Sequence, residues 1–146
     1  MDGKWMSERM SMSDLQPKAG TTEKITINLG VVDLGQIDLV VQEGFYSNRT
    51  DFIRTAVRNQ LQVHTDVVKQ TVSRKTLDLG LRHYTRADLE RVRDAGERLE
   101  IQVLGLVSIA PDVSPELASE TIQSITVLGA LHASSAVKKA LADRIR

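Results

Sequence analysis

Cysteine is absent from this chain of 146 residues. Its absence excludes a disulfide framework and metal sites built on thiolates. Aromatic residues make up only 3% of the chain, so the core must consist mainly of Ile, Leu, Val and Ala. No stretch approaches the roughly 18 apolar residues of a membrane span, and no apolar run with a cleavage signal follows the N-terminus. These absences predict a cytoplasmic protein that does not associate with membranes.

An excess of charge of either sign is also lacking, because 19 basic residues balance 19 acidic ones. Nucleic-acid-binding proteins often carry a basic excess. Any affinity for DNA must therefore come from a local surface, and residues 48–75 offer one with six Lys and Arg against two Asp. The overall composition, 41% hydrophobic and 26% charged, is typical of a folded protein with one domain or two small ones.

Signatures of catalysis and of metal binding are missing as well. The chain contains no Gly-x-Gly-x-x-Gly, no phosphate-binding Gly-Lys-Ser/Thr loop and no nucleophile elbow. Its three histidines, His64, His83 and His132, lie far apart and have no Cys, Glu or His neighbour at ligand spacing. We therefore expect no enzyme activity, no metal site and no cofactor.

The first half of the chain contains one strand pattern followed by two helix patterns. Residues 1–21 have no periodicity and are predicted to be a flexible arm. From Lys24 to Leu29 polar and apolar residues alternate, which predicts a strand with one buried face. An amphipathic helix is expected next, with Asp33 as its N-cap and Gly44 just beyond its end.

A second helix is predicted to begin near Asn48. Asn48 and Asp51 have the spacing of a capping box, with Asp in place of the usual Glu. The apolar stripe of this helix consists of Phe52, Ile53, Ala56, Val57 and Leu61. Residues 63–75 are expected to be a linker or an extension of the helix.

An internal repeat occupies residues 76–146. Three short strand patterns run into glycine, at Gly80, Gly105 and Gly129, and each is followed by a helix start signal. The glycines are 25 and then 24 residues apart, close to the length of a leucine-rich-repeat-like solenoid unit. The leucines before Gly80 are one residue out of phase with the later units. We predict a small solenoid-like βα-repeat domain that drives oligomerisation.

This repeat domain is small for independent stability. Pairing with a second copy through its strand residues, or through an unpaired strand edge, would increase the buried apolar area. The strand residues expected to pair are Ile101, Val103, Ile125 and Val127.

The strand and two helices of residues 22–62 cannot bury their apolar faces alone. Two chains solve this when their strands pair antiparallel beneath four helices, which makes an intertwined homodimer. The polar residues of the strand then face outward on a ribbon narrow enough to enter a major groove. The dimer core would contain Ile25, Ile27, Leu29, Ile37, Phe52 and Ile53.

Residues 22–61 closely resemble the ribbon-helix-helix family of Arc, MetJ and CopG type. The matching runs are Lys24-Ile-Thr-Ile-Asn-Leu29 and Gly44-Phe-Tyr-Ser-Asn-Arg-Thr-Asp-Phe-Ile-Arg-Thr-Ala-Val-Arg58. Two positions depart from the family pattern. Gly30 stands where a proline commonly follows the strand, and Asn28 stands where a long basic residue is frequent.

The resemblance implies an α+β fold and a bacterial transcription regulator that binds double-stranded DNA. Lys24, Thr26 and Asn28 would read base edges. Asn48, Arg49 and Thr50, at the start of the second helix, would contact a phosphate. For Arg49 an intramolecular salt bridge is the alternative role.

The expected function is that of a repressor or autoregulator acting as a homodimer, with a higher homo-oligomer formed through residues 76–146. One alternative is the antitoxin of a toxin–antitoxin pair, whose C-terminal part masks a toxin. The other is a polymerising scaffold protein that coats DNA with little sequence preference.

Overall fold

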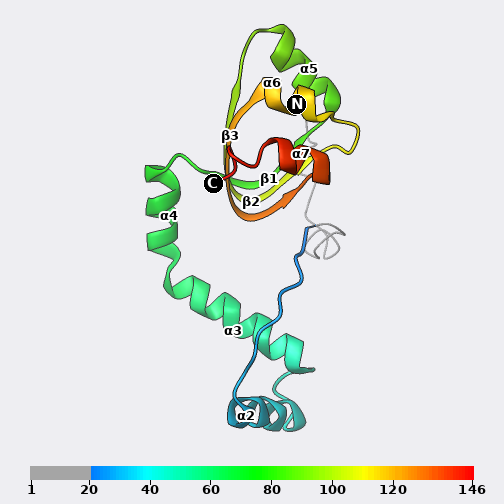
Figure 1. The fold of residues 1–146 in the computed structure, drawn as a ribbon. Coiled ribbons are helices and arrows are strands. Elements are labelled where there is room, and N and C mark those ends of the chain that lie inside the picture. Colours follow the sequence, from blue (N-terminus) through cyan, green and yellow to red (C-terminus); the bar gives the residue numbers. More distant parts are fainter. Residues whose placement is uncertain (1–20) are drawn as a thin grey trace, which may run out of the picture.

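The computed structural model describes residues 21–146, so the predicted arm lies outside the described residues except for Thr21. Helices and strands are mixed along the chain, as expected for an α+β protein (Figure 1). The elements are α2 Val31–Gln42, α3 Arg49–Val63, α4 Thr65–Arg74, β1 Asp78–Tyr84, α5 Arg86–Asp94, β2 Leu99–Ile109, α6 Pro115–Thr121, β3 Ile122–His132 and α7 Ser135–Ala140.

Helix α2 begins three residues earlier than the sequence suggests. Its N-cap is Gly30 in an extended conformation, so the expectation that Asp33 caps the helix was wrong. Asp33 lies instead in the first turn, where a carboxylate interacts favourably with the positive end of the helix dipole. Gly44 follows the end of the helix with φ +87°, as predicted, and its backbone N–H donates to the Val41 carbonyl.

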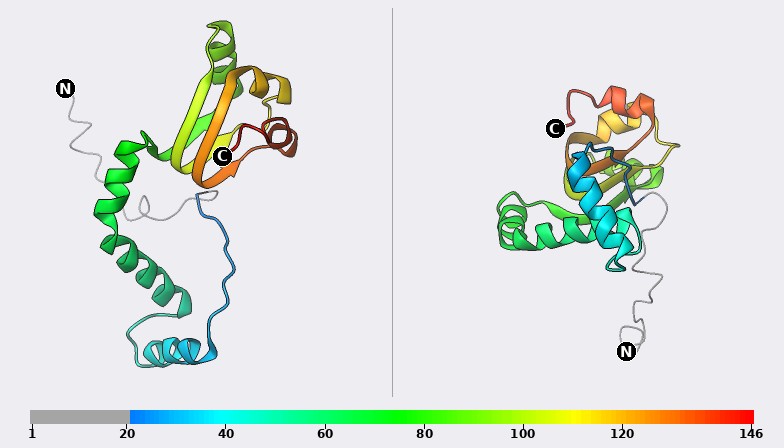
Figure 2. Two further views of the ribbon diagram at one scale, coloured as in Figure 1. Left: turned by 60° about the vertical axis from the view of Figure 1, so that its left-hand side comes forward. Right: turned by 90° about the horizontal axis from the view of Figure 1, so that it is seen from below.

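Helix α3 begins where the capping signal predicts. The Asn48 side chain accepts a hydrogen bond from the Asp51 backbone N–H at 2.8 Å. Just before the helix, the Tyr46 ring packs edge-on against Phe52 with 5.0 Å between centroids. His64 interrupts the helical run, and α4 continues from Thr65. Helices α3 and α4 therefore meet at a bend and together lead to the sheet (Figure 2).

Residues 22–30 belong to neither a helix nor a strand in the single chain. They run as a drawn-out segment from the sheet to α2 (Figure 1). A strand needs a hydrogen-bonded neighbour, and residues 21–146 of one chain provide none for this segment. The ribbon therefore remains a prediction about two chains.

The C-terminal half is a three-stranded parallel sheet in the order β1-β2-β3. Each strand is followed by a short helix, and all three N-caps that the sequence predicts are present. Thr85 forms a reciprocal capping box with Asp88, while Ser114 and Ser134 each accept one backbone N–H. Successive right-handed crossovers place consecutive helices on the same face of a sheet.

The core lies between the sheet and these three helices. Leu89, Leu117 and Val137 of the helices are buried in it with the strand residues of one sheet face. The strand residues include Ile101, Val103 and Ile125, which are almost completely buried, and Val127 packs against them. The expectation that these four residues pair with a second copy was therefore wrong, because the helices of the same chain already cover them.

The three repeat glycines lie within the strands and do not end them as the sequence suggests. Gly80, Gly105 and Gly129 are aligned in register across the sheet. Their φ values of +122°, +140° and +128° are in the region that favours glycine. A Cβ on Gly105 would lie 2.2 Å from the Gly80 carbonyl oxygen, and one on Gly129 would lie 2.0 Å from that of Gly105. Glycine is thus required for the close approach of neighbouring strands.

Candidate nucleic-acid interface

The three residues predicted to read bases lie on the segment that precedes α2. Lys24, Thr26 and Asn28 are all exposed. The alternating Ile25 and Ile27 are 78% and 56% exposed, so the single chain leaves both faces of the segment open. Such exposure of large apolar side chains is typical of a surface that becomes buried in an interface.

The start of α3 has the geometry of an anion site. Asn48 caps the Asp51 N–H, and the Asp51 carboxylate accepts from the Ser47 N–H at 2.9 Å. Within residues 21–146, no protein group accepts a hydrogen bond from the backbone N–H of Arg49 or Thr50. These free donors and the helix dipole point toward any anion placed there.

The Arg49 side chain is already paired within the chain. Its Nε and Nη2 donate to the two carboxylate oxygens of Asp38 at 2.7 and 2.8 Å, which joins α3 to α2. The hydrogen bond from Arg49 lowers the pKa of Asp38, and the same bond raises the pKa of Arg49. The salt bridge expected as the alternative role is therefore present. Because the pair is exposed, the same guanidinium is accessible to an anion from solution.

A groove of about 670 Å³ separates the drawn-out segment from the first half of α3. Its apolar lining comes from Ile25, Ile27, Ile53 and Val57. Its charged lining consists of three basic residues, Lys24, Arg54 and Arg58, and one acidic residue, Glu23. Among the six predicted DNA-contacting residues, Lys24 and Thr50 share this groove, while the other four lie outside it. The sequence alone suggests only surface charge for Arg54 and Arg58, although their i, i+4 spacing on α3 places them on one helix face.

A comparison with family models decides the family. The model of the ribbon-helix-helix transcriptional regulator family matches residues 20–138. The chain belongs to that family. The match extends beyond the segment with the recognised motifs, through the parallel sheet and into α7, so the C-terminal elements are part of what defines this family. No curated protein and no solved structure matches the chain.

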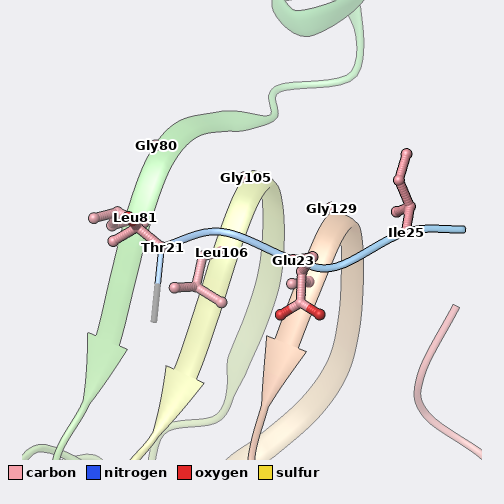
Figure 3. A pocket seen from close by; sticks show the side chains of 9 residues that line it. Thr21, Glu23, Ile25, Gly80, Leu81, Gly105, Leu106 and Gly129 are labelled. Carbon is pink, nitrogen blue, oxygen red and sulfur yellow. The ribbon is translucent and has the colours of Figure 1, made fainter. Parts of the chain in front are cut away.

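In this ribbon-helix-helix protein the segment that leads to the predicted ribbon also contacts the sheet. Residues 21–25 cross the face of the sheet that the helices leave open (Figure 3). They pass over the glycine row, which consists of Gly80, Gly105 and Gly129. This segment and the sheet enclose a hollow of about 420 Å³. It is lined by Thr21, Glu23, Ile25, the three glycines, Leu81, Leu106 and Ala130. The Glu23 carboxylate hydrogen-bonds to His132 Nε2 at the end of β3. The segment predicted to read DNA and the sheet are thereby connected.

Within residues 21–146, no group of three or more His, Asp or Glu residues is placed to hold a metal ion. Over the same range, the structure contains no helix with the length and hydropathy needed to cross a membrane.

Proposed function

We propose that this ribbon-helix-helix regulator binds DNA as a homodimer and inserts a two-stranded ribbon, formed by residues 24–29 of both chains, into the major groove. The observation that carries the proposal is the unpaired segment itself, in which exposed apolar residues alternate with exposed polar ones. Antiparallel pairing of two such segments buries the isoleucines against the helices. It leaves Lys24, Thr26 and Asn28 on the outer face.

The outer face has the chemistry for reading base edges. Lysine donates to guanine O6 and N7, asparagine makes a paired hydrogen bond to adenine, and threonine contacts either a base or a thymine methyl group. The twofold arrangement of a dimer doubles this set, so the proposed target is a short palindromic operator. Occupation of an operator by such a dimer represses transcription, including that of its own gene.

The start of α3 would hold the dimer on the DNA backbone. The free N–H groups of Arg49 and Thr50 would bind one phosphate, and the Asn48 cap keeps the first turn in shape. Contacts of this kind fix orientation and carry no sequence information. The basic side chains of Lys24, Arg54 and Arg58 add positive charge to the same region.

The antitoxin alternative requires a C-terminal part that becomes ordered on its toxin. Here residues 78–140 form a sheet with its own buried core. That order favours a regulator with a folded second part over an antitoxin.

The test is selection of bound sequences from random duplex DNA, followed by binding measurements on the preferred site. Asn28→Ala should relax preference at one base position of each half-site, a loss of about 1–3 kcal/mol of discrimination. Asn59→Ala is the matched control, because Asn59 is an exposed asparagine on α3 outside the groove. Equal losses on the selected site and on random DNA from Asn28→Ala would contradict the readout role.

A further inference from the structure

We propose that the open face of the parallel sheet is an interface between two copies of this chain, centred on the row Leu79–Leu104–Leu128. These three leucines are in register on β1, β2 and β3. They face away from the helices, because Val103 and Val127, which precede Leu104 and Leu128, pack on the helix side. Leu79 is 70% exposed and Leu128 is 52% exposed. The inference rests on the proposed function insofar as a dimer brings the second copy near.

The orientation of β1 is the strongest indication that this face becomes covered. β1 directs Leu79 and Leu81 to the open face, and Asp78 and Arg82 to the helix side. The two charged residues form a salt bridge at 3.5 Å and are more than half exposed, so the helices do not cover this part of the strand. A strand that presented its open face to water would have the reverse arrangement, with leucines toward the core. The one-residue phase shift in the sequence repeat is the origin of this reversal.

Charged side chains are also absent from the part of the open face around the leucine row. Register places five rows on it: Glu100–Ser124, Gln102–Thr126, Leu79–Leu104–Leu128, Leu81–Leu106–Ala130 and His83–Ser108–His132. The Glu23 carboxylate also lies at this face, bonded to His132. Lys, Arg, Asp and Glu are absent from the leucine row and from the row on either side of it, although they make up 26% of the chain. Two identical faces that meet at the leucine row can therefore make an isologous contact about a twofold axis without placing like charges at its centre.

Within residues 21–146, the same chain covers only part of this face. Residues 21–25 enclose the hollow over the row Leu81–Leu106–Ala130, and the row Leu79–Leu104–Leu128 does not line that hollow. Ile25 lines both the hollow and the groove beside α3, so the apolar surface continues from the predicted ribbon to the sheet. A second copy joined through the ribbon holds its own sheet at high effective concentration. A second copy is therefore the occupant that fits the remaining row.

The two edge strands of the sheet are less suited than the open face to binding a second copy. Beside β3, the C-terminal residues already pair with Ile125, whose N–H donates to the Arg144 carbonyl while its own carbonyl accepts from the Arg146 N–H. The edge of β1 carries Asp78 and Arg82, and charged residues at an edge discourage strand addition. Pairing through the β1 edge is the competing arrangement that the test must separate.

Cross-linking provides the test, because the chain has no native cysteine. Thr126→Cys places one thiol on the open face, and Ser135→Cys places one on α7 at the helix side. With a flexible bis-maleimide, the Thr126→Cys protein should give a covalent dimer in high yield, and the Ser135→Cys protein should give little. Adding Leu128→Lys to Thr126→Cys should reduce the dimer yield at least several-fold. Adding Gln123→Lys, an exposed position near the start of the same strand, should leave the yield unchanged.

Each outcome has one meaning. A yield from Thr126→Cys that equals that of Ser135→Cys, or that is insensitive to Leu128→Lys, overturns the inference. Insensitivity to Leu128→Lys would indicate pairing at the β1 edge, because β3 is the far strand of the sheet. Gel shifts on the same samples separate the two proposals. Cross-linking without DNA binding overturns the proposed function alone, and DNA binding without face-specific cross-linking overturns this inference alone.

Discussion

At the scale of single residues, Arg49 has two competing partners. Its guanidinium is held by both carboxylate oxygens of Asp38 in the free protein, and a phosphate bound at the start of α3 would lie within reach of the same donors. Exposed ion pairs of this kind contribute little to stability. Exchange of a carboxylate for a phosphate is therefore possible without disturbing the junction of α2 and α3.

We expect Arg49→Ala and Asp38→Asn to change DNA affinity in opposite directions. Arg49→Ala removes a cation, so it should weaken binding to specific and random DNA alike and lower the salt slope by about one for each phosphate that the arginine neutralises. Asp38→Asn removes the competing carboxylate and should tighten binding to both. Salt-dependent titrations measure these effects, and Arg91→Ala on α5 is a control for removal of an exposed arginine. Equal weakening by both variants would mean that Arg49 acts only by joining the helices.

The sequence predicts residue-level features where their cause is local. Asn48, Ser114 and Ser134 are recognisable as caps because a cap needs only the next three residues. The Asp38 partner of Arg49 lies eleven residues away on another helix, and no sequence pattern selects it among the acidic residues. Asp33 resembles a cap in the sequence, but Gly30 fills that role without a side-chain signal.

At the scale of elements, the βα order of the C-terminal half is predictable and the length of its strands is not. Glycine commonly ends a strand pattern, and a glycine with positive φ inside a strand is recognisable only when the neighbouring strands are aligned. The phase of Leu79 and Leu81 is visible in the sequence. The sequence does not show whether these leucines face the core or the open side of the sheet, because that depends on which face the helices cover.

The glycine row predicts a graded response to alanine. Gly80→Ala meets no atom within 4 Å, so its cost is the strain of the positive φ, about 1–3 kcal/mol. Gly105→Ala carries similar strain and also overlaps the Gly80 backbone, so it should lower the free energy of unfolding by more. Gly35→Ala in α2 should be neutral or slightly stabilising. Urea unfolding measures the order, and equal losses of stability at Gly80 and Gly105 would contradict the close approach.

At the scale of the whole molecule, the single chain is unevenly buried. The C-terminal half contains nearly all of the buried core, whereas Ile37 is the one buried residue in the described part before residue 77. Exposed apolar residues are concentrated between Ile25 and Val68. The sequence anticipates this imbalance, since a lone strand and two helices cannot enclose a core. The arrangement of two chains cannot be read from one chain and stays a prediction.

We expect Ile27→Asp to abolish the dimer and DNA binding together. The substitution would place two carboxylates in the shared core, at a cost of several kcal/mol. The C-terminal sheet should stay folded, because Ile27 does not line its hollow. Sedimentation, gel shift and circular dichroism measure the three effects, and Ile27→Val is the conservative control. A dimer that survives Ile27→Asp and still binds DNA would refute the ribbon assignment.

The glycine row has a further consequence for how the sheet assembles. Sliding β2 along β1 by one residue would place Leu104 or Leu106 beside Gly80, at a site where even a single methyl group collides with the carbonyl oxygen. The same exclusion operates between β2 and β3. Misaligned pairings are thereby disfavoured by steric repulsion at two successive junctions, so three strands with similar sequences have one preferred alignment.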